Sequence, residues 1–149
     1  MLTIKDSERA ISDDEITRIE LQYRIALPDE YRAFLKSHNG GRPKPSGFWF
    51  QTPRGKVRSS IDWFLAIYNG EYDNWETYYH TFKVHQVRMP PELVPIAHDA
   101  GGNQICIDVS KRVGAVYFWD HEEEADVPDY SNVYLIAASF SEFLDSLHD

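Results

Sequence analysis

Residues 27–41 read LPDEYRAFLKSHNGG, and this stretch predicts a helix with a defined start and a defined end. Pro28 suits the first helical position, where its missing N–H costs no hydrogen bond, and the acidic pair 29–30 suits the positive end of the helix dipole. We expect Asn39-Gly40-Gly41 to end the helix, because glycine and asparagine adopt the left-handed conformation of a C-terminal cap. The buried stripe is predicted from helical spacing as Tyr31, Phe34, Leu35 and His38.

A shorter helix is predicted before this stretch. Residues 12–15 read SDDE, which is the pattern of a capping box: the serine oxygen accepts from the backbone N–H of Glu15, and the glutamate reaches back. This helix should end near Arg24 or Ile25. Its apolar face is predicted to consist of Ile16, Ile19 and Tyr23.

Beyond Gly47 the period changes from helical to alternating. Phe48 and Phe50 share one face with Trp49 on the other, residues 53–55 read as a turn, and residues 60–65 form a second strand candidate, which together predict a hairpin or meander. Residues 69–88 are predicted as a helix that Pro90-Pro91 ends. The aromatic side chains that favour this helix are Tyr72, Trp75, Tyr79 and Phe82.

The rest of the chain predicts strands followed by one helix. The strands are 93–97, 104–109, 115–119 and 133–137, with a glycine-rich turn at 99–103 and an antiparallel hairpin across 110–114. Ser139-Phe140-Ser141-Glu142 is a second capping box, which starts a C-terminal helix. The predicted class is α+β: one domain over residues 1–149, with a mainly antiparallel sheet on which the N-terminal helices and the C-terminal helix pack.

Composition fits a folded cytoplasmic protein. Hydrophobic residues make up 42% of the 149, which is too apolar for disorder, and one cysteine allows no intramolecular disulfide. The first residues lack the apolar core of a signal peptide, and no apolar run is long enough to cross a membrane. We therefore expect a cytoplasmic location and no membrane contact.

Charge is distributed unevenly along the chain. Up to Arg112 there are fifteen Lys/Arg and fifteen Asp/Glu, whereas residues 113–149 hold nine acids and no Lys/Arg, which accounts for the net charge of −9. Six of the nine acids fall in the run DHEEEADVPD at 120–129. Most charge runs are solvated loops, and this one has the same alternative. Like charges at this density repel one another, however, so a partner with a basic surface would relieve the repulsion, and we favour an interface.

One stretch has the opposite sign. Between Glu30 and Asp62 there are no acids, and the stretch from Lys36 to Arg58 carries six Lys/Arg residues. The nearby aromatic residues alternate like a strand and do not form a base-stacking platform. We therefore interpret these charges as solvated loops and expect no direct nucleic-acid binding, in keeping with the acidic balance of the whole chain.

Three ordered segments resemble those of the SUKH superfamily: residues 27–41, residues 93–109 with 114–121, and residues 139–147. The resemblance spans about residues 12–148. It implies an α+β fold and a non-enzymatic binding role, since the superfamily includes fungal cell-wall assembly regulators and bacterial immunity proteins that neutralise toxin domains, often nucleases or deaminases. The matched prolines and glycines, such as Pro28, Gly40 and Gly101, meet backbone requirements, so function should lie elsewhere on the surface.

Catalytic and metal-binding readings have weaker support. Asp99 with Asp120, or the adjacent His98 and His121, would give an acid–base enzyme, but adjacency in sequence establishes neither geometry nor separated pKa values. Cys106 lies inside a predicted strand, and His80 and His85 are five apart, which does not place them on one helix face. We expect no catalytic residue, no cofactor and no metal.

The leading hypothesis is an immunity protein that binds a basic toxin domain, such as a nuclease, through an acidic surface. An alternative is a regulatory or scaffold module of the cell-wall assembly type, which binds host proteins. Trp119 and Tyr134 are further candidate aromatic anchors, and a core position is the equal alternative for Trp119. The predicted partner-binding residues are Asp120, Glu122, Glu123, Glu124, Asp126, Asp129 and Tyr130.

Overall fold

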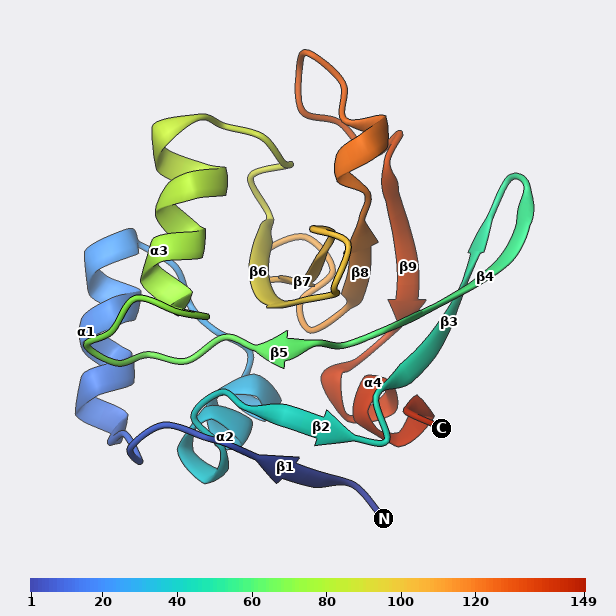
Figure 1. Cartoon of the computed structure of the whole chain (residues 1–149). Helices are drawn as coiled ribbons and strands as arrows, with labels where there is room; N and C mark the ends of the chain where they lie inside the picture. Colours follow the sequence, from blue (N-terminus) through green and yellow to red (C-terminus); the bar gives the residue numbers. More distant parts are fainter.

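A five-stranded antiparallel sheet forms the centre of the protein in the computed structural model, which describes all residues 1–149 (Figure 1). The strands follow the order β5-β6-β7-β8-β9, so strands that are consecutive in the sequence are also neighbours in the sheet. The predicted turn at 99–103 is confirmed by the pairing of His98 with Gln104, and the predicted hairpin across 110–114 is confirmed by the pairing of Ile105 with Phe118. The strands are β5 (Trp63–Phe64), β6 (Leu93–His98), β7 (Gln104–Asp108), β8 (Val116–Trp119) and β9 (Val133–Ala137).

Both faces of this sheet are covered. Alternate residues of β7 are buried on opposite faces: Ile105 and Ile107 belong to the large core cluster, and Cys106 belongs to a smaller cluster on the other face. Trp119 of β8 belongs to the smaller cluster and is fully buried, so it is a core residue and not an exposed anchor. A sheet buried on both faces needs continuous apolar strands, which is what residues 93–97 and 105–107 supply.

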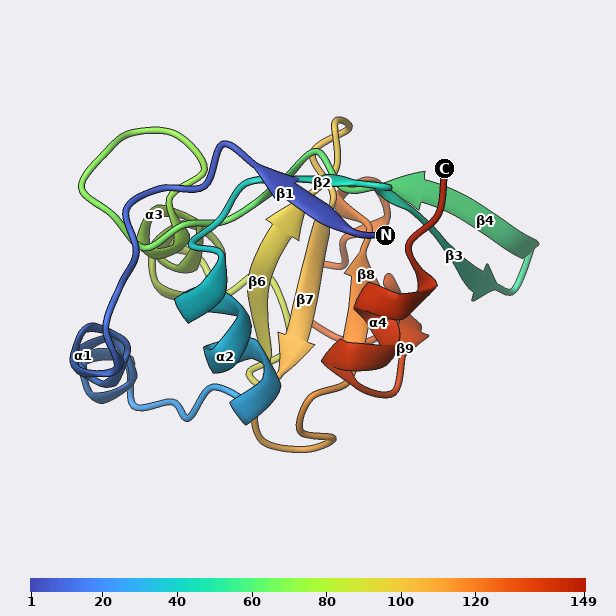
Figure 2. The same ribbon diagram turned by 90° about the horizontal axis from the view of Figure 1, so that it is seen from below.

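Helices α2 (Asp29–Ser37) and α4 (Phe140–Ser146) lie in front of the strands of the central sheet in the view of Figure 2, with α1 (Asp13–Tyr23) at the left edge of the view. Helix α1 starts at the predicted capping box, since the Ser12 hydroxyl accepts from the Glu15 N–H and the Glu15 carboxylate accepts from the Ser12 N–H. Helix α4 is capped by Ser139, but Glu142 bonds the N–H of Ala138, so the second box is only half formed. Helix α2 buries Tyr31, Phe34 and Leu35 as predicted.

The end of α2 differs from the prediction. His38 follows the helix with extended backbone, and the left-handed positions are Gly40 and Gly41 with φ of 73° and 120°. Gly40 is required for close packing, because a Cβ there would lie 2.6 Å from the Cβ of Ala66. Asn39 is buried and fixes the segment after β5. Its side-chain amide donates to the backbone carbonyl of Ile67 and accepts from the backbone N–H of Ile67, at 2.8 Å each.

The predicted helix over 69–88 is shorter than expected. Helix α3 (Trp75–Tyr79) begins after Asn74, whose side chain accepts from the Thr77 N–H, and it continues into a π-helical segment, η1 (His80–His85). Tyr72 lies outside the helix and is exposed, because Asn74 bonds the carbonyls of residues 68 and 70 and holds that segment as a loop. Trp75, Tyr79 and Phe82 form the buried face.

The predicted strand at 60–65 is wrong in its bounds. Strand β3 (Gly47–Thr52) pairs with β4 (Gly55–Ser60), and only Trp63–Phe64 of the predicted strand belongs to the central sheet. The polar composition of β4, GKVRSS, hides its strand character, because none of its residues is buried and it therefore needs no apolar alternation. A second small pair, β1 (Thr3–Lys5) with β2 (Arg42–Lys44), was not predicted at all.

Candidate functional site

The acidic run forms a closed loop after β8. We call residues 120–130 the acidic loop; it extends away from the end of the sheet (Figure 1). Asp120 starts a 3-10 turn (His121–Glu123) by accepting from the Glu122 N–H at 2.9 Å. The base of the loop is closed by Asn132, whose backbone carbonyl accepts from the Asp120 N–H and whose amide donates to the Asp120 carbonyl, both at 2.9 Å.

Two of the predicted binding residues are already paired within the fold. Glu124 accepts two hydrogen bonds from Arg88, at 3.0 Å from Nε and 2.9 Å from Nη2. Glu123 lies 3.2 Å from Nη2 of Arg54 and also accepts from the Tyr134 hydroxyl at 3.0 Å. The sequence places no cation in residues 113–149, but the fold supplies cations from distant segments, and this lowers the net charge that the loop presents.

Arg88 also anchors the loop to the core. Its guanidinium carbon lies 4.7 Å from the ring centre of Phe82 and 5.5 Å from that of Trp119. The ion pair with Glu124 raises the pKa of Arg88 further above its ordinary value. Because the pair is half-buried and stacked on aromatic rings, its position is fixed more firmly than that of an exposed salt bridge.

Tyr130 ends the loop and is tied to two other segments. Its hydroxyl donates to Glu92 at 2.7 Å, and Nζ of Lys111 lies 5.5 Å from its ring centre. Burial and then the Glu92 carboxylate raise the pKa of Tyr130. The ring remains 39% exposed, so part of it is available for contact.

Four acids of the loop have no ion-pair partner. Asp120 is partly buried and accepts from the backbone N–H of Glu122, and the other three are exposed. Glu122 and Asp126 are exposed, and their carboxylates make neither a hydrogen bond nor an ion pair with another residue. Asp129 accepts from the N–H and hydroxyl of Ser131, which lowers its pKa. Its bonds are to uncharged groups, so its negative charge is uncompensated. The free charge of the loop is thus concentrated in residues 122, 126 and 129.

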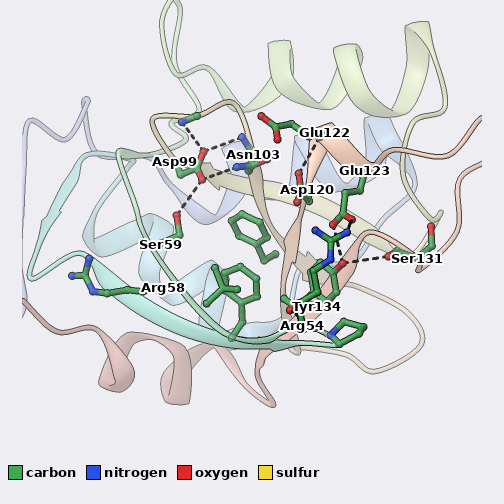
Figure 3. Close-up of a pocket in the computed structure, with 16 residues that line it drawn as sticks. Arg54, Arg58, Ser59, Asp99, Asn103, Asp120, Glu122, Glu123, Ser131 and Tyr134 are labelled. Carbon is green, nitrogen blue, oxygen red and sulfur yellow. Dashed lines mark hydrogen bonds and ion pairs between the residues drawn. The ribbon is translucent and has the colours of Figure 1, made fainter.

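A pocket of about 540 Å³ lies beside the acidic loop (Figure 3). One wall is the inner face of the β3–β4 hairpin, where Phe50 stacks on Phe118 with ring centres 4.3 Å apart. The others are the turn at 99–103 and the start of the acidic loop. Polar side chains dominate the lining, and those labelled in Figure 3 are Arg54, Arg58, Ser59, Asp99, Asn103, Asp120, Glu122, Glu123, Ser131 and Tyr134.

The pocket brings Asp99 and Asp120 to one place, but their contacts are structural. Asp99 is buried and accepts four hydrogen bonds: from the N–H of Gly101, the N–H and side-chain amide of Asn103, and the hydroxyl of Ser59, at 2.9 to 3.1 Å. Burial raises the pKa of Asp120. Because hydrogen bonds occupy its lone pairs, the Asp99 carboxylate organises the turn and is poorly placed to exchange protons with a substrate.

His80 and His85 lie on one face, contrary to the expectation from their spacing, because residues five apart align in the π-helical segment η1; their ring centres are 5.7 Å apart. His98 and His121 have separate partners. His98 contacts Asp73 at 2.6 Å, whereas Nδ1 of His121 contacts Asn103 at 2.7 Å. Cys106 is fully buried, and burial raises the pKa of its thiol to about 12, which disfavours the reactive thiolate. No three His, Cys, Asp or Glu side chains are arranged to hold a metal ion.

Sequence reasoning missed the cations of this region. Arg54, Arg88 and Lys111 lie on three different segments, and no local pattern connects them with the acidic loop. Tyr134, a candidate aromatic anchor, lies half-buried in the pocket wall, and its hydroxyl donates to Glu123. The only signal in the sequence is the excess of negative charge itself, which indicates that cations from other segments of the chain compensate part of it.

Fold and surface together define a small α+β domain whose most distinctive feature is an acidic loop beside a polar pocket. The chain belongs to the SMI1 / KNR4 family (SUKH-1), whose model matches residues 10–146. It is also similar to the SPbeta prophage-derived uncharacterized protein YokK of Bacillus subtilis (strain 168), with 28% identity over 155 residues. That match covers 93% of this chain and 75% of the relative. None of the helices has the length and apolar character needed to span a membrane.

Proposed function

We propose that this chain is a non-enzymatic protein-binding domain that acts in the cytoplasm as an immunity protein. It would neutralise a cognate bacterial toxin by binding it directly through the acidic loop. The observation that carries the proposal is the uncompensated charge of Glu122, Asp126 and Asp129 on a loop that extends away from the sheet.

The loop is suited to a basic partner for electrostatic reasons. Its paired acids, Glu123 and Glu124, fix the shape of the loop through Arg54 and Arg88, while the unpaired acids stay available. A partner rich in Lys and Arg, such as a nuclease domain, would meet this surface with complementary charge and associate faster through long-range attraction. The exposed part of Tyr130 offers an aromatic contact at the edge of the same surface.

The pocket adds shape to this charged surface. Glu122 and Glu123 belong both to the loop and to the pocket lining, so a partner docked on the loop also covers the pocket mouth. On the opposite wall, Arg54 and Arg58 add positive charge. A surface of mixed sign beside a strongly negative loop favours one orientation of a bound protein, because the reverse orientation would oppose like charges.

Family membership supports a binding role. The superfamily that this sequence resembles includes immunity proteins, and the relative in Bacillus subtilis is prophage-derived by its name, which favours a bacterial setting. The structural role of Asp99 supports the non-enzymatic part of the proposal. The same family description also carries the names of the cell-wall regulators, so a regulatory or scaffold module that binds host proteins is the second candidate.

A growth experiment separates the two candidates. The gene directly upstream is sequenced, and the toxin domain that we expect it to encode is expressed from an inducible promoter in a bacterium, with or without this chain. An immunity protein restores growth, and it does so against that toxin and not against an unrelated one. A regulatory module leaves the growth arrest unchanged, and that result would contradict the proposal.

A further inference from the structure

A second pocket, of about 510 Å³, lies on a different part of the molecule and shares no residue with the first. Its lining comes from the segment after β1, from β5 and from the loop between β5 and α3, which is drawn in light green in Figure 2. The backbone around Gly41, Phe64 and Ala66 also contributes to the lining. The side chains that give it chemical character are Trp63, Tyr68, Tyr72, Asp6, Glu8 and Asp73.

The aromatic part of this pocket is preformed by its own loop. The Tyr68 hydroxyl donates to the Tyr72 carbonyl and accepts from the Tyr72 N–H at 3.1 Å. Gly70 packs directly on the Tyr68 ring, since a Cβ at this position would lie 2.2 Å from it. The Asn74 amide donates to the carbonyls of Tyr68 and Gly70 at 2.8 and 3.0 Å. These bonds hold Tyr72 out of the core, with its side chain 77% exposed.

All charged side chains that line the pocket are negative. Asp6 and Glu8 make no side-chain hydrogen bond and no ion pair, and Asp73 is paired only with the His98 imidazole. Arg42 contacts the aromatic wall without lining the pocket; its guanidinium carbon lies 5.5 Å from the ring centre of Trp63. The Trp63 ring therefore already accepts a guanidinium contact in the free protein.

We propose that this pocket receives an arginine side chain of a protein partner. A planar guanidinium stacks on aromatic faces and donates to carboxylates in a fixed geometry, so it uses both kinds of wall, whereas the ammonium of lysine is smaller and more strongly hydrated. Neutral side chains would leave the unpaired carboxylates Asp6 and Glu8 without compensation. This site is independent of the acidic loop, and it gives the protein a second contact surface with its own specificity.

The test uses the purified full chain and N-acetyl-arginine methylamide as the probe, followed by the four tryptophan indole N–H signals in nitrogen–proton NMR spectra. The Trp63 signal is assigned with Trp63→Phe. We expect it to shift in a saturable way, with a dissociation constant on the order of millimolar for so small a ligand. The signals of the buried Trp75 and Trp119 should not move.

Variants locate the binding. Asp6→Asn with Glu8→Gln should weaken the affinity about three- to tenfold, because two attractive charges are removed. Asparagine tolerates the left-handed backbone of Asp6, whose φ is 60°, so the fold is kept. Tyr72→Ala removes an exposed aromatic wall and should also weaken binding. The matched control is Asp145→Asn with Asp149→Asn, which changes the net charge equally but lies outside the pocket and should leave the affinity unchanged.

Ligand comparison decides the chemistry. The order of affinity should be the arginine derivative, then N-acetyl-lysine methylamide, with no saturable shift from N-acetyl-alanine methylamide. Equal shifts from the alanine derivative, or an unchanged affinity in the Asp6/Glu8 variant, would overturn the proposal. Tighter binding of tetramethylammonium than of the arginine derivative would assign the pocket to a quaternary ammonium compound and would overturn it as well. None of these results depends on the toxin or on the acidic loop.

Discussion

Arg88 and Glu124 form a two-point ion pair that fixes the acidic loop to the aromatic rings beneath it. The two side chains are 28% and 23% exposed, so the pair is partly shielded from water. The loop is therefore a shaped surface whose geometry depends on some of its acids, while other acids remain free for a partner.

Removing one partner of this pair should destabilise the protein. We expect Glu124→Gln to lower the free energy of unfolding by about 1–2 kcal/mol, between the values for exposed and buried pairs, because Arg88 would be left half-buried without its anion. Urea unfolding measures the change. Glu122→Gln makes the same chemical change at a free carboxylate two positions away, and it should change the free energy of unfolding by less than about 0.5 kcal/mol. Equal losses in both variants would contradict the division into paired and free acids.

Charge reversal at the free acids should affect association and not folding. For Glu122→Lys with Asp126→Lys we expect association with a basic partner to slow about tenfold at low salt, and to depend less on salt, because long-range attraction is reduced. Stopped-flow kinetics at two salt concentrations provide the measurement. Asp145→Lys with Asp149→Lys carries the same change of net charge at the C-terminus. If this control slows association equally, the effect comes from overall charge and not from the loop.

Acid should weaken the start of α1. The Arg9 guanidinium and the Ser12 N–H hold the pKa of Glu15 at about 2, below its ordinary 4.5. A carboxylate with a lowered pKa in the folded state contributes stability above the unfolded value, and this contribution is lost as pH falls from about 4.5 to about 2. Urea midpoints across this window should fall less steeply in Glu15→Gln. An unchanged slope would show that the capping box does not contribute to the acid response.

Asp120 offers a test of the enzyme alternative that does not unfold the protein. Asp99→Asn is unsuitable, because it would disturb four hydrogen bonds of a buried turn. Asp120→Asn keeps an acceptor for the Glu122 N–H, so we expect the turn and the protection of the host cell to be retained. Growth in the presence of the toxin gives the readout. Loss of protection with an intact fold and intact partner binding would favour catalysis.

The family glycine at position 40 should be required for packing and not only for its backbone conformation. Gly40→Ala places a Cβ 2.6 Å from Ala66, whereas Gly114→Ala meets no atom within 4 Å; both positions have positive φ. The backbone strain is therefore shared, and we expect Gly40→Ala to cost about 2 kcal/mol more because of the clash. Thermal or urea unfolding of the two variants isolates this difference.

Local signals in the sequence predicted local structure well. Ser12 and Glu15 are three residues apart, and their capping box forms as expected because it needs no distant partner. The apolar runs of β6 and β7 predicted the central sheet, because a sheet that is buried on both faces is built from continuous apolar strands. Strand β4 was missed because its side chains are largely exposed, so its sequence lacks the apolar alternation that marks a strand.

The candidate site was predictable only in part. The density of acids at 120–129 pointed to the loop, but the ion pairs that shape it join residues 36 and 69 positions apart. Pairs of this kind depend on tertiary structure and leave no spacing pattern in the chain. The aromatic pocket beside β5 was missed for the same reason, since Asp6, Trp63 and Tyr72 come together only in the fold.

Titration of the toxin with the purified chain tests the central claim most directly. The catalytic activity of the toxin domain identified by the growth experiment is measured against increasing amounts of the chain, and the complex is followed by size-exclusion chromatography. We predict that activity falls in a stoichiometric way as the complex forms, and that Glu122→Lys with Asp126→Lys shifts this titration to higher concentration. Full toxin activity in the presence of excess folded chain, with no complex, would contradict the account.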